Sequence, residues 1–291
     1  MNRQLSHFLQ LGLAIFIMSS SGTLGRFIDM PAPVIIWVRC VIAAVALFVI
    51  IKIGPFDFRL PKGKEFNALF ISSLFLGAHW VSYFYALKLS SVAVGMLSLF
   101  TYPVITAFLE PIMLKTRFDK VSIVLGLLAL VGVALLAPEL SLRNDFTVGI
   151  LIGVGSAIVY AVRNIMMKTQ VSGQSGVTLM FYQLLIIDIA LLPVVFMFDF
   201  DLSMGVLANW KPYLVLGLLT TATGHTLFVL SFKNFTITTV SIISAITPLL
   251  GTLLGFVVLG EIPAGRTYIG GVLIFLTVIA ESVKSVRWRE N

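Results

Sequence analysis

Long apolar runs constrain this chain more than any other feature of its sequence. Residues 34–51 and 121–137 contain a single charged side chain between them. A helix needs about 20 mainly apolar residues to cross a hydrocarbon core roughly 30 Å thick. Charged residues make up 11% of the chain, against about 25% in soluble domains, so the chain lacks the charged surface of a soluble protein. The sequence therefore predicts an all-α membrane protein.

We expect ten transmembrane helices, separated by short segments that carry helix breakers such as Gly54-Pro55 and Pro263. No A-x-A cleavage pattern follows the first apolar run, so the first helix is expected to be retained. None of the intervening segments is long enough to hold a separate domain, which assigns function to the helices and their short loops. The predicted spans are residues 8–25, 33–53, 66–87, 91–112, 121–137, 148–168, 177–198, 212–232, 236–259 and 265–283.

The net charge of +7 is explained better by a membrane than by a nucleic-acid partner. Lys and Arg lie in short inter-helix segments, and alternate segments carry 13 and 5 of them, with Arg39 and Arg163 left inside helices. Cytoplasmic loops hold such an excess. We therefore expect both termini in the cytoplasm and insertion in a bacterial-type inner membrane. The single cysteine, Cys40, excludes an internal disulfide.

The two halves of the chain contain an internal repeat. Residues 88–103 (KLSSVAVGMLSLFTYP) and 233–248 (KNFTITTVSIISAITP) are related by an offset of 145 residues (233 − 88), which also relates Gly126 to Gly271. Because each unit has five helices, the second enters the membrane from the opposite side. Inverted repeats are typical of alternating-access transporters, whose substrate site lies between the halves. We expect the repeats at residues 1–140 and 146–285.

Several short motifs add a resemblance to a known family. They are Ser21-Gly22-Thr23, Arg39, Pro103, Pro248 and Leu259-Gly260-Glu261. With these motifs, the sequence resembles the EamA-type members of the drug/metabolite transporter superfamily over nearly its whole length. The resemblance implies ten helices in two inverted five-helix halves, and export of amino acids, other small metabolites or drugs. In one departure, the first half has Lys115-Thr116-Arg117 where the second has Gly260-Glu261-Ile262.

The third predicted helix carries the densest group of polar and aromatic side chains, His79, Trp80 and Tyr83. The offset of 145 places Trp80 onto His225 (225 − 80), so both halves contribute a large polar-tipped ring at matching depth. An aromatic cavity with a few hydrogen-bonding groups suits an amphipathic organic solute. The alternative is that these rings bond between helices or mark the membrane interface. Facing helices add Tyr102, Ser98, Ser244 and Thr247 to the predicted substrate-binding set.

Charged residues inside spans are the other candidates, because such groups are costly in hydrocarbon. Arg39, whose repeat mate is Gln183, could pair with a substrate carboxylate or a neighbouring polar group, or snorkel to the surface. A structural or gating role is favoured over direct contact. Tyr160 and Arg163 are candidates to line the inner mouth of the path. The alternative for Arg163 is that its side chain snorkels to the membrane surface. Asp188, the only acid in the middle of a span, is a candidate for proton coupling, although its helical neighbours are leucines.

Two prolines at matching positions, Pro103 and Pro248, are expected to kink the fourth and ninth helices and to mark the moving, substrate-facing region. Glycines of the fifth and tenth helices are expected to allow close packing that supports the fold rather than the path.

The leading hypothesis is an exporter of small amphipathic metabolites, including aromatic amino acids, that works by alternating access. The alternative is an importer of a quaternary amine or another small metabolite, held by cation–π contacts. The sequence has no P-loop, which excludes ATP as the direct energy source. An enzyme would need clustered acids or a serine–histidine pair at depth, and a channel would need rings of like side chains, so neither is expected. We expect no cofactor, metal or nucleic acid, a small-molecule substrate and the bilayer as partners, and a monomer or homodimer.

Overall fold

The computed structural model describes residues 3–115, 120–137, 141–170, 175–198, 202–235, 240, 243–244 and 246–290. These residues are mostly helical and form no strand, which confirms the all-α fold class. In chain order the helices are α1 (Arg3–Phe27), α2 (Ala32–Ile53), α3 (Lys64–Leu89), α4 (Val92–Leu99), α5 (Tyr102–Leu114), α6 (Lys120–Leu136), α7 (Asp145–Gln170), α8 (Gly176–Val195), η1 (Leu202–Leu207), α9 (Trp210–Leu214), η2 (Val215–His225), α10 (Thr226–Asn234), α12 (Thr247–Leu259) and α13 (Gly265–Glu290).

The described helices match the predicted spans either as long apolar segments or as shorter apolar helices. Seven segments are long and apolar enough to cross a membrane by length and composition. Three shorter apolar helices, within α6, α12 and α13, stand where the fifth, ninth and tenth spans are predicted. The protein is thus a multi-pass membrane protein, while the count of ten spans stays a prediction.

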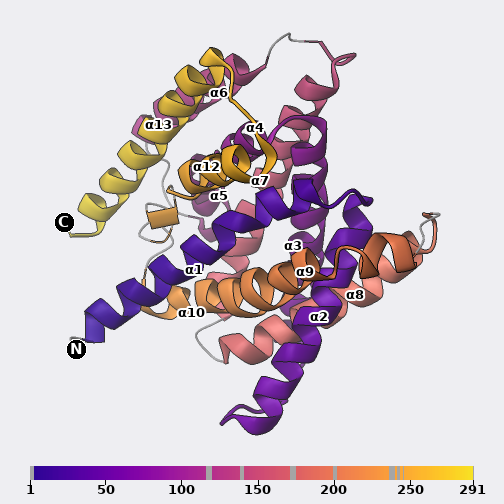
Figure 1. The fold of residues 1–291 in the computed structure, drawn as a ribbon. Coiled ribbons are helices and arrows are strands. Elements are labelled where there is room, and N and C mark those ends of the chain that lie inside the picture. The colour runs from indigo at the N-terminus through magenta and orange to yellow at the C-terminus, as the bar shows by residue number, and fades with distance from the viewer. Residues whose placement is uncertain are drawn as a thin grey trace.

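The helices of the two halves pack against each other in matching pairs. Helix α1 packs against η2, α10 and α12, and its repeat counterpart α7 packs in the same way against α3, α4 and α5. Helix α2 packs against its own counterpart α8, and α6 against α13. Figure 1 shows α6 and α13 side by side at one edge of the bundle. Such paired contacts are those of two inverted five-helix repeats.

Two apolar cavities reproduce the same symmetry. One, of about 360 Å³, lies between α4, α12 and α13; the other, of about 320 Å³, lies between α5, α6 and α7. Gly271 and Leu249 line the first, and their repeat mates Gly126 and Val104 line the second. The sequence offset of 145 therefore corresponds to equivalent places in space.

The two prolines that were expected to kink helices lie in the first turn of new ones, and the kink itself stays a prediction. Helix α4 ends at Leu99 and α5 begins at Tyr102, so Pro103 is the second residue of α5, and Pro248 is the second residue of α12. Proline lacks an N–H group but is accepted in the first turn, where that group has no helical partner. The fourth span is therefore interrupted at Phe100 and Thr101. Residues 236–239, 241–242 and 245 of the predicted ninth helix lie outside the described residues.

The predicted helix at 212–232 is divided as well, because its middle part, η2, is a π-helix. The hydroxyl groups of Thr221 and Thr223 donate to carbonyl oxygens five residues earlier, at Leu216 and Leu218. Stretches of π-helix are rare in proteins, and those that do occur often lie at functional sites. Sequence periodicity did not predict this one.

Glycines bring α6 and α13 into close contact, as expected. A Cβ atom added to Gly270 would lie 2.6 Å from the carbonyl oxygen of Gly132, and one added to Gly132 would lie 2.8 Å from Ile274. Without a hydrophobic force between helices in lipid, such close backbone approach is a main source of association. This pair of helices supports the bundle from its outside.

Gly270→Ala is expected to lower the stability of the protein by about 1–3 kcal/mol, because the backbone of Gly132 must shift to admit a methyl group. Thermal unfolding of the protein in detergent measures the effect. Gly155→Ala is the matched control, since nothing lies within 4 Å of its added Cβ, and should be neutral or slightly stabilising. Equal effects of the two substitutions would contradict the packing described here.

Candidate substrate-binding cavity

A cavity of about 60 Å³ lies in the interior between the two halves. Helices α1, α3, α4 and α5 of the first half contribute to its wall, as do α7, η2, α10 and α12 of the second. Its lining residues are Ile15, Met18, Ser21, His79, Trp80, Tyr83, Leu99, Phe100, Tyr102, Tyr160, His225, Phe228, Ser244 and Thr247. Eight of the eleven substrate-binding residues predicted from the sequence, Tyr160 among them, therefore meet in one place.

The cavity lies where equivalent positions of the two repeats come together. Ten of the 14 lining residues form five pairs, each separated by the repeat offset of 145. Trp80 and His225 are one such pair, and their rings touch, with centroids 4.9 Å apart at 70°. The two halves thus present equivalent positions to the same space. The other pairs are Ile15 with Tyr160, Tyr83 with Phe228, Leu99 with Ser244, and Tyr102 with Thr247.

His79 is held in one orientation by two hydrogen bonds to Ser156 of α7. The serine hydroxyl lies 2.8 Å from His79 Nδ1 and donates to the backbone oxygen of His79, also at 2.8 Å. Because the only hydroxyl proton goes to that oxygen, we assign the ring proton to Nδ1, which donates to Ser156 Oγ. In the neutral ring, Nε2 is then left as an acceptor. The ring also stacks on Tyr160, with centroids 4.2 Å apart.

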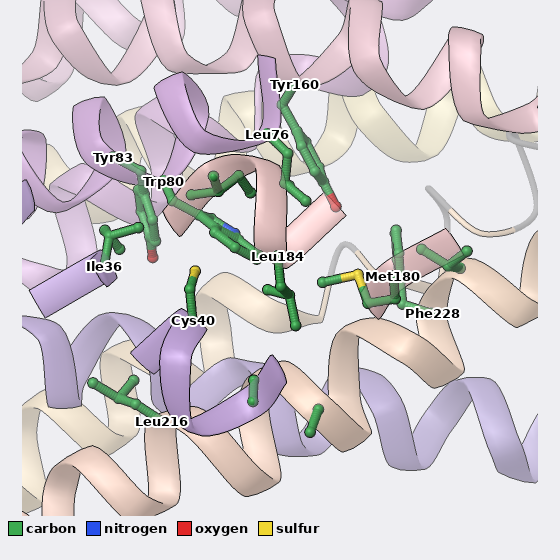
Figure 2. Packing of buried hydrophobic residues seen from close by; sticks show 14 of the residues in the cluster. Ile36, Cys40, Leu76, Trp80, Tyr83, Tyr160, Met180, Leu184, Leu216 and Phe228 are labelled. Atoms are coloured by element: carbon green, nitrogen blue, oxygen red, sulfur yellow. The ribbon is translucent and has the colours of Figure 1, made fainter. Parts of the chain in front are cut away.

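The remaining aromatic residues form a continuous wall. Tyr102 lies edge-on to Tyr160 at 5.0 Å, and Phe100 lies edge-on to Tyr102 at 5.6 Å. Figure 2 shows Trp80 and Tyr83 projecting together from one helix into the packed interior, with Tyr160 facing them from another. Such a wall presents apolar ring faces with polar tips, which suits an organic solute with both apolar and polar parts.

Two polar atoms of the cavity wall lack a hydrogen-bond partner in the described structure. They are His225 Nδ1 and Ser244 Oγ, both in buried side chains. Buried polar atoms are normally bonded, and exceptions call for a reason such as a missing ligand. These two atoms are available to bind a solute.

Comparison with known proteins identifies the family of this chain. The model of the EamA-like transporter family matches residues 7–137 and 147–281, one match for each half. The chain belongs to the EamA-like transporter family. An uncharacterized transporter of Archaeoglobus fulgidus is 27% identical over 243 residues, which cover 84% of each chain.

One further relative and one solved structure are similar to this chain. An uncharacterized transporter of Synechocystis sp. is 25% identical over 195 residues, and the match covers 64% of this chain but only 56% of that one. A crystal structure that is 18% identical superimposes with a TM-score of 0.69 over 98% of this chain and 99% of the other, which shows a shared fold.

Arg39 of this EamA-like protein lies behind the cavity wall and does not snorkel. Its side chain is fully buried, and its guanidinium donates to Thr221 Oγ1 at 2.8 Å and to Ser21 Oγ at 3.2 Å. It also donates to Thr220 Oγ1 at 3.4 Å and lies over the Trp80 ring, 4.7 Å from the centroid. Arg39 thus positions Trp80 and ties α1, α2 and η2 together.

Arg163 occupies the corresponding network of the second half. It donates to Gln183 Oε1 at 2.7 Å and to Asn164 Oδ1 at 3.2 Å, and it is fully buried. Gln183, the repeat mate of Arg39, in turn donates to Ser72 of α3 at 3.2 Å. Each half therefore contains one buried arginine in a network of neutral groups, but the arginine comes from different helices.

Two predicted site residues lie elsewhere. The structure places Ser98 away from the cavity, because its hydroxyl donates to Val94 within α4 and its Cβ packs against Gly153. Asp188 is partly buried on α8 and is absent from the cavity wall, and its Oδ1 atom has no hydrogen-bond partner in the described structure. Its proposed part in proton coupling stays a prediction.

Sequence reasoning missed six lining residues, most of them apolar. The repeat offset could have found three of them, since Ile15, Leu99 and Phe228 are the mates of predicted residues. Ser21 was noted only as part of a family motif. No signal in the sequence distinguished Met18 and Phe100 from other apolar residues in their helices.

A charged cluster joins four helix ends at one end of the bundle, and we name it the Arg26–Glu261 latch. Arg26, near the end of α1, pairs with Glu261, which follows α12. The same guanidinium donates to backbone oxygens of Leu87 and Lys88 at the end of α3. The other oxygen of Glu261 accepts the backbone N–H of Val92, the first residue of α4, at 2.8 Å. The latch is contributed by both halves.

Loss of the latch is expected to open this end of the bundle. The test uses a background protein with Cys40→Ser and Met18→Cys, in which an impermeant maleimide is added from the side of Arg26. In this background, Glu261→Gln should raise the labelling of residue 18 by about tenfold. That factor corresponds to about 1.4 kcal/mol in an opening equilibrium. Glu65→Gln, at an exposed position near the start of α3, is the control and should change nothing. Equal labelling of both variants would show that the latch does not close the path.

Proposed function

We propose that this protein exports small amphipathic metabolites, including aromatic amino acids, across a bacterial-type inner membrane by alternating access. The observation that carries the proposal is the central cavity, which both repeats line at equivalent positions and whose wall carries aromatic rings and two unpartnered polar atoms. In inverted-repeat transporters, the substrate site lies at this place.

The size of the cavity supports a mechanism with moving helices. Its volume of about 60 Å³ is well below the roughly 300–1,000 Å³ of ligand sites, so a metabolite enters only after helices separate. The interruption between α4 and α5 and the start of α12 at matching depth supply places where the backbone can adjust. The latch then holds one end closed, and its release opens that end.

The direction and topology belong to the same proposal. The distribution of Lys and Arg supports cytoplasmic termini, and the latch then lies on the periplasmic side. The energy source is proton coupling through Asp188, exchange or facilitated diffusion, and a version of the counterflow experiment below with a pH jump across the membrane tests the coupling through Asp188.

Import of a quaternary amine is the second candidate, because Trp80, Tyr83 and Tyr102 line the cavity and could hold a cation by cation–π contacts. Direction and charge preference distinguish the two candidates.

Counterflow in proteoliposomes, with a panel of amino acids, choline-like amines and nucleosides, tests the proposal. Aromatic amino acids are expected to exchange, and His79→Ala and Trp80→Ala should reduce their flux by about tenfold or more, as a loss of 1.4 kcal/mol of binding does. Trp210→Ala, which removes an exposed tryptophan outside the cavity, is the matched control for Trp80.

Normal flux in both cavity variants would reject the site, provided that their amounts in the membrane match the wild type. Exchange of choline-like amines alone would favour the second candidate.

A further inference from the structure

Two arginines are buried beside the central cavity without a compensating charge. Arg39 and Arg163 are both fully buried, and every hydrogen-bond partner described for them is a neutral hydroxyl or amide. No ion pair of either guanidinium is found among the described residues, so no carboxylate of the described chain lies within 4.0 Å of Arg39 or Arg163. A buried charge without a partner is unfavourable, and inside a membrane it marks a functional site.

Arg39 lies directly behind the cavity wall, and Arg163 lies one helical turn from it. Arg39 contacts two lining residues, since it donates to Ser21 and lies over the ring of Trp80. Arg163 follows the lining residue Tyr160 by one helical turn, and its repeat mate at offset 145, Met18, lines the cavity itself. In addition, Arg163 Nε is buried and has no hydrogen-bond partner in the described structure.

The only acid within the middle of a span forms no ion pair with either arginine among the described residues. Asp188 is on α8, as is Gln183, but its Oδ1 atom has no hydrogen-bond partner in the described residues and it forms no ion pair there. The cavity therefore lies in a positive field from two sides. In a medium of low dielectric constant, such a field extends over several ångströms and is weakly screened.

We infer that the central cavity selects solutes that carry a carboxylate, and that Arg39 and Arg163 are the residues that determine this selection. The inference rests on the proposed function and specifies its substrate class. The arginines act through the field and through Ser21 and Trp80, while the aromatic wall holds the rest of the solute. A bound carboxylate supplies the negative charge that the protein lacks there. A quaternary amine would add a third positive charge, which disfavours the second candidate function.

Three probes that share an aromatic ring and differ in charge test the selection without knowledge of the natural substrate. Sodium benzoate, benzamide and phenyltrimethylammonium share a phenyl ring but are negative, neutral and positive. At equal concentration and ionic strength, benzoate is expected to raise the thermal unfolding midpoint of the full chain in detergent by about 2 °C or more above the shift with benzamide. The cation should produce no stabilisation.

The charge of each arginine is tested by Arg39→Gln and Arg163→Gln, which keep a hydrogen-bond donor but remove the positive charge. Each is expected to abolish most of the difference between the benzoate shift and the benzamide shift, because that difference measures the selection for charge. Arg59→Gln, at an exposed position outside the described helices, is the matched control and should retain the full effect. If either cavity variant fails to fold, the three probes on the wild-type protein decide alone.

The result that overturns the inference is a benzoate shift no larger than that of benzamide, including no shift with either, or a larger shift with the cation. This readout is separate from transport. Absence of amino-acid counterflow would reject the proposed substrates, while a preference for benzoate would still stand as evidence of carboxylate selection.

Discussion

Lipid offers no hydrogen-bond partner to a polar side chain, and this constraint organises the structure. Polar groups of the spans must meet one another in the interior, and here they meet where the two halves join. Arg39 reaches hydroxyl groups on α1 and η2, and Gln183 links Arg163 of α7 to Ser72 of α3. The outer helices α6 and α13 instead associate through glycines. The need to satisfy polar groups therefore gathers the potential site residues on the axis between the repeats, and leaves the periphery to packing.

Duplication explains the position of the cavity, and divergence explains its chemistry. Equivalent residues of two inverted repeats approach each other only near the axis that relates them, as Trp80 and His225 do. Most pairs are no longer chemically similar. Ile15 is the repeat mate of Tyr160, and Leu99 is the repeat mate of Ser244. The wall is thus symmetric in shape but not in polarity. The latch shows the same divergence, because Glu261 has Thr116 as its repeat mate, and the first half has no acid there.

Much of the fold and part of the site could be predicted from residues alone. Apolar run lengths predicted the helices, and the offset of 145 predicted the inverted halves that the packing of α1 and α7 reproduces. Deep aromatic and histidine side chains such as His79 were recognised because they are costly in lipid unless they have a use. Ser98 was misplaced because helical position alone does not show that a hydroxyl is already bonded within its own helix. Met18 and Phe100 could not be found, since an apolar residue is equally at home facing lipid, a neighbouring helix or a cavity.

The sequence by itself determined that this protein lies in a lipid bilayer, that it is all-helical and that it contains an internal repeat. These properties depend on composition and on the spacing of residues along the chain. Only the tertiary structure decided that Pro103 and Pro248 begin helices, that the eighth span widens into a π-helix, and that Arg26 meets Glu261 across the two halves. It also decided that both buried arginines lack an acidic partner in the described chain. Such facts depend on which residues distant in the sequence come within a few ångströms, and that is set by the packing of helices rather than by any local pattern.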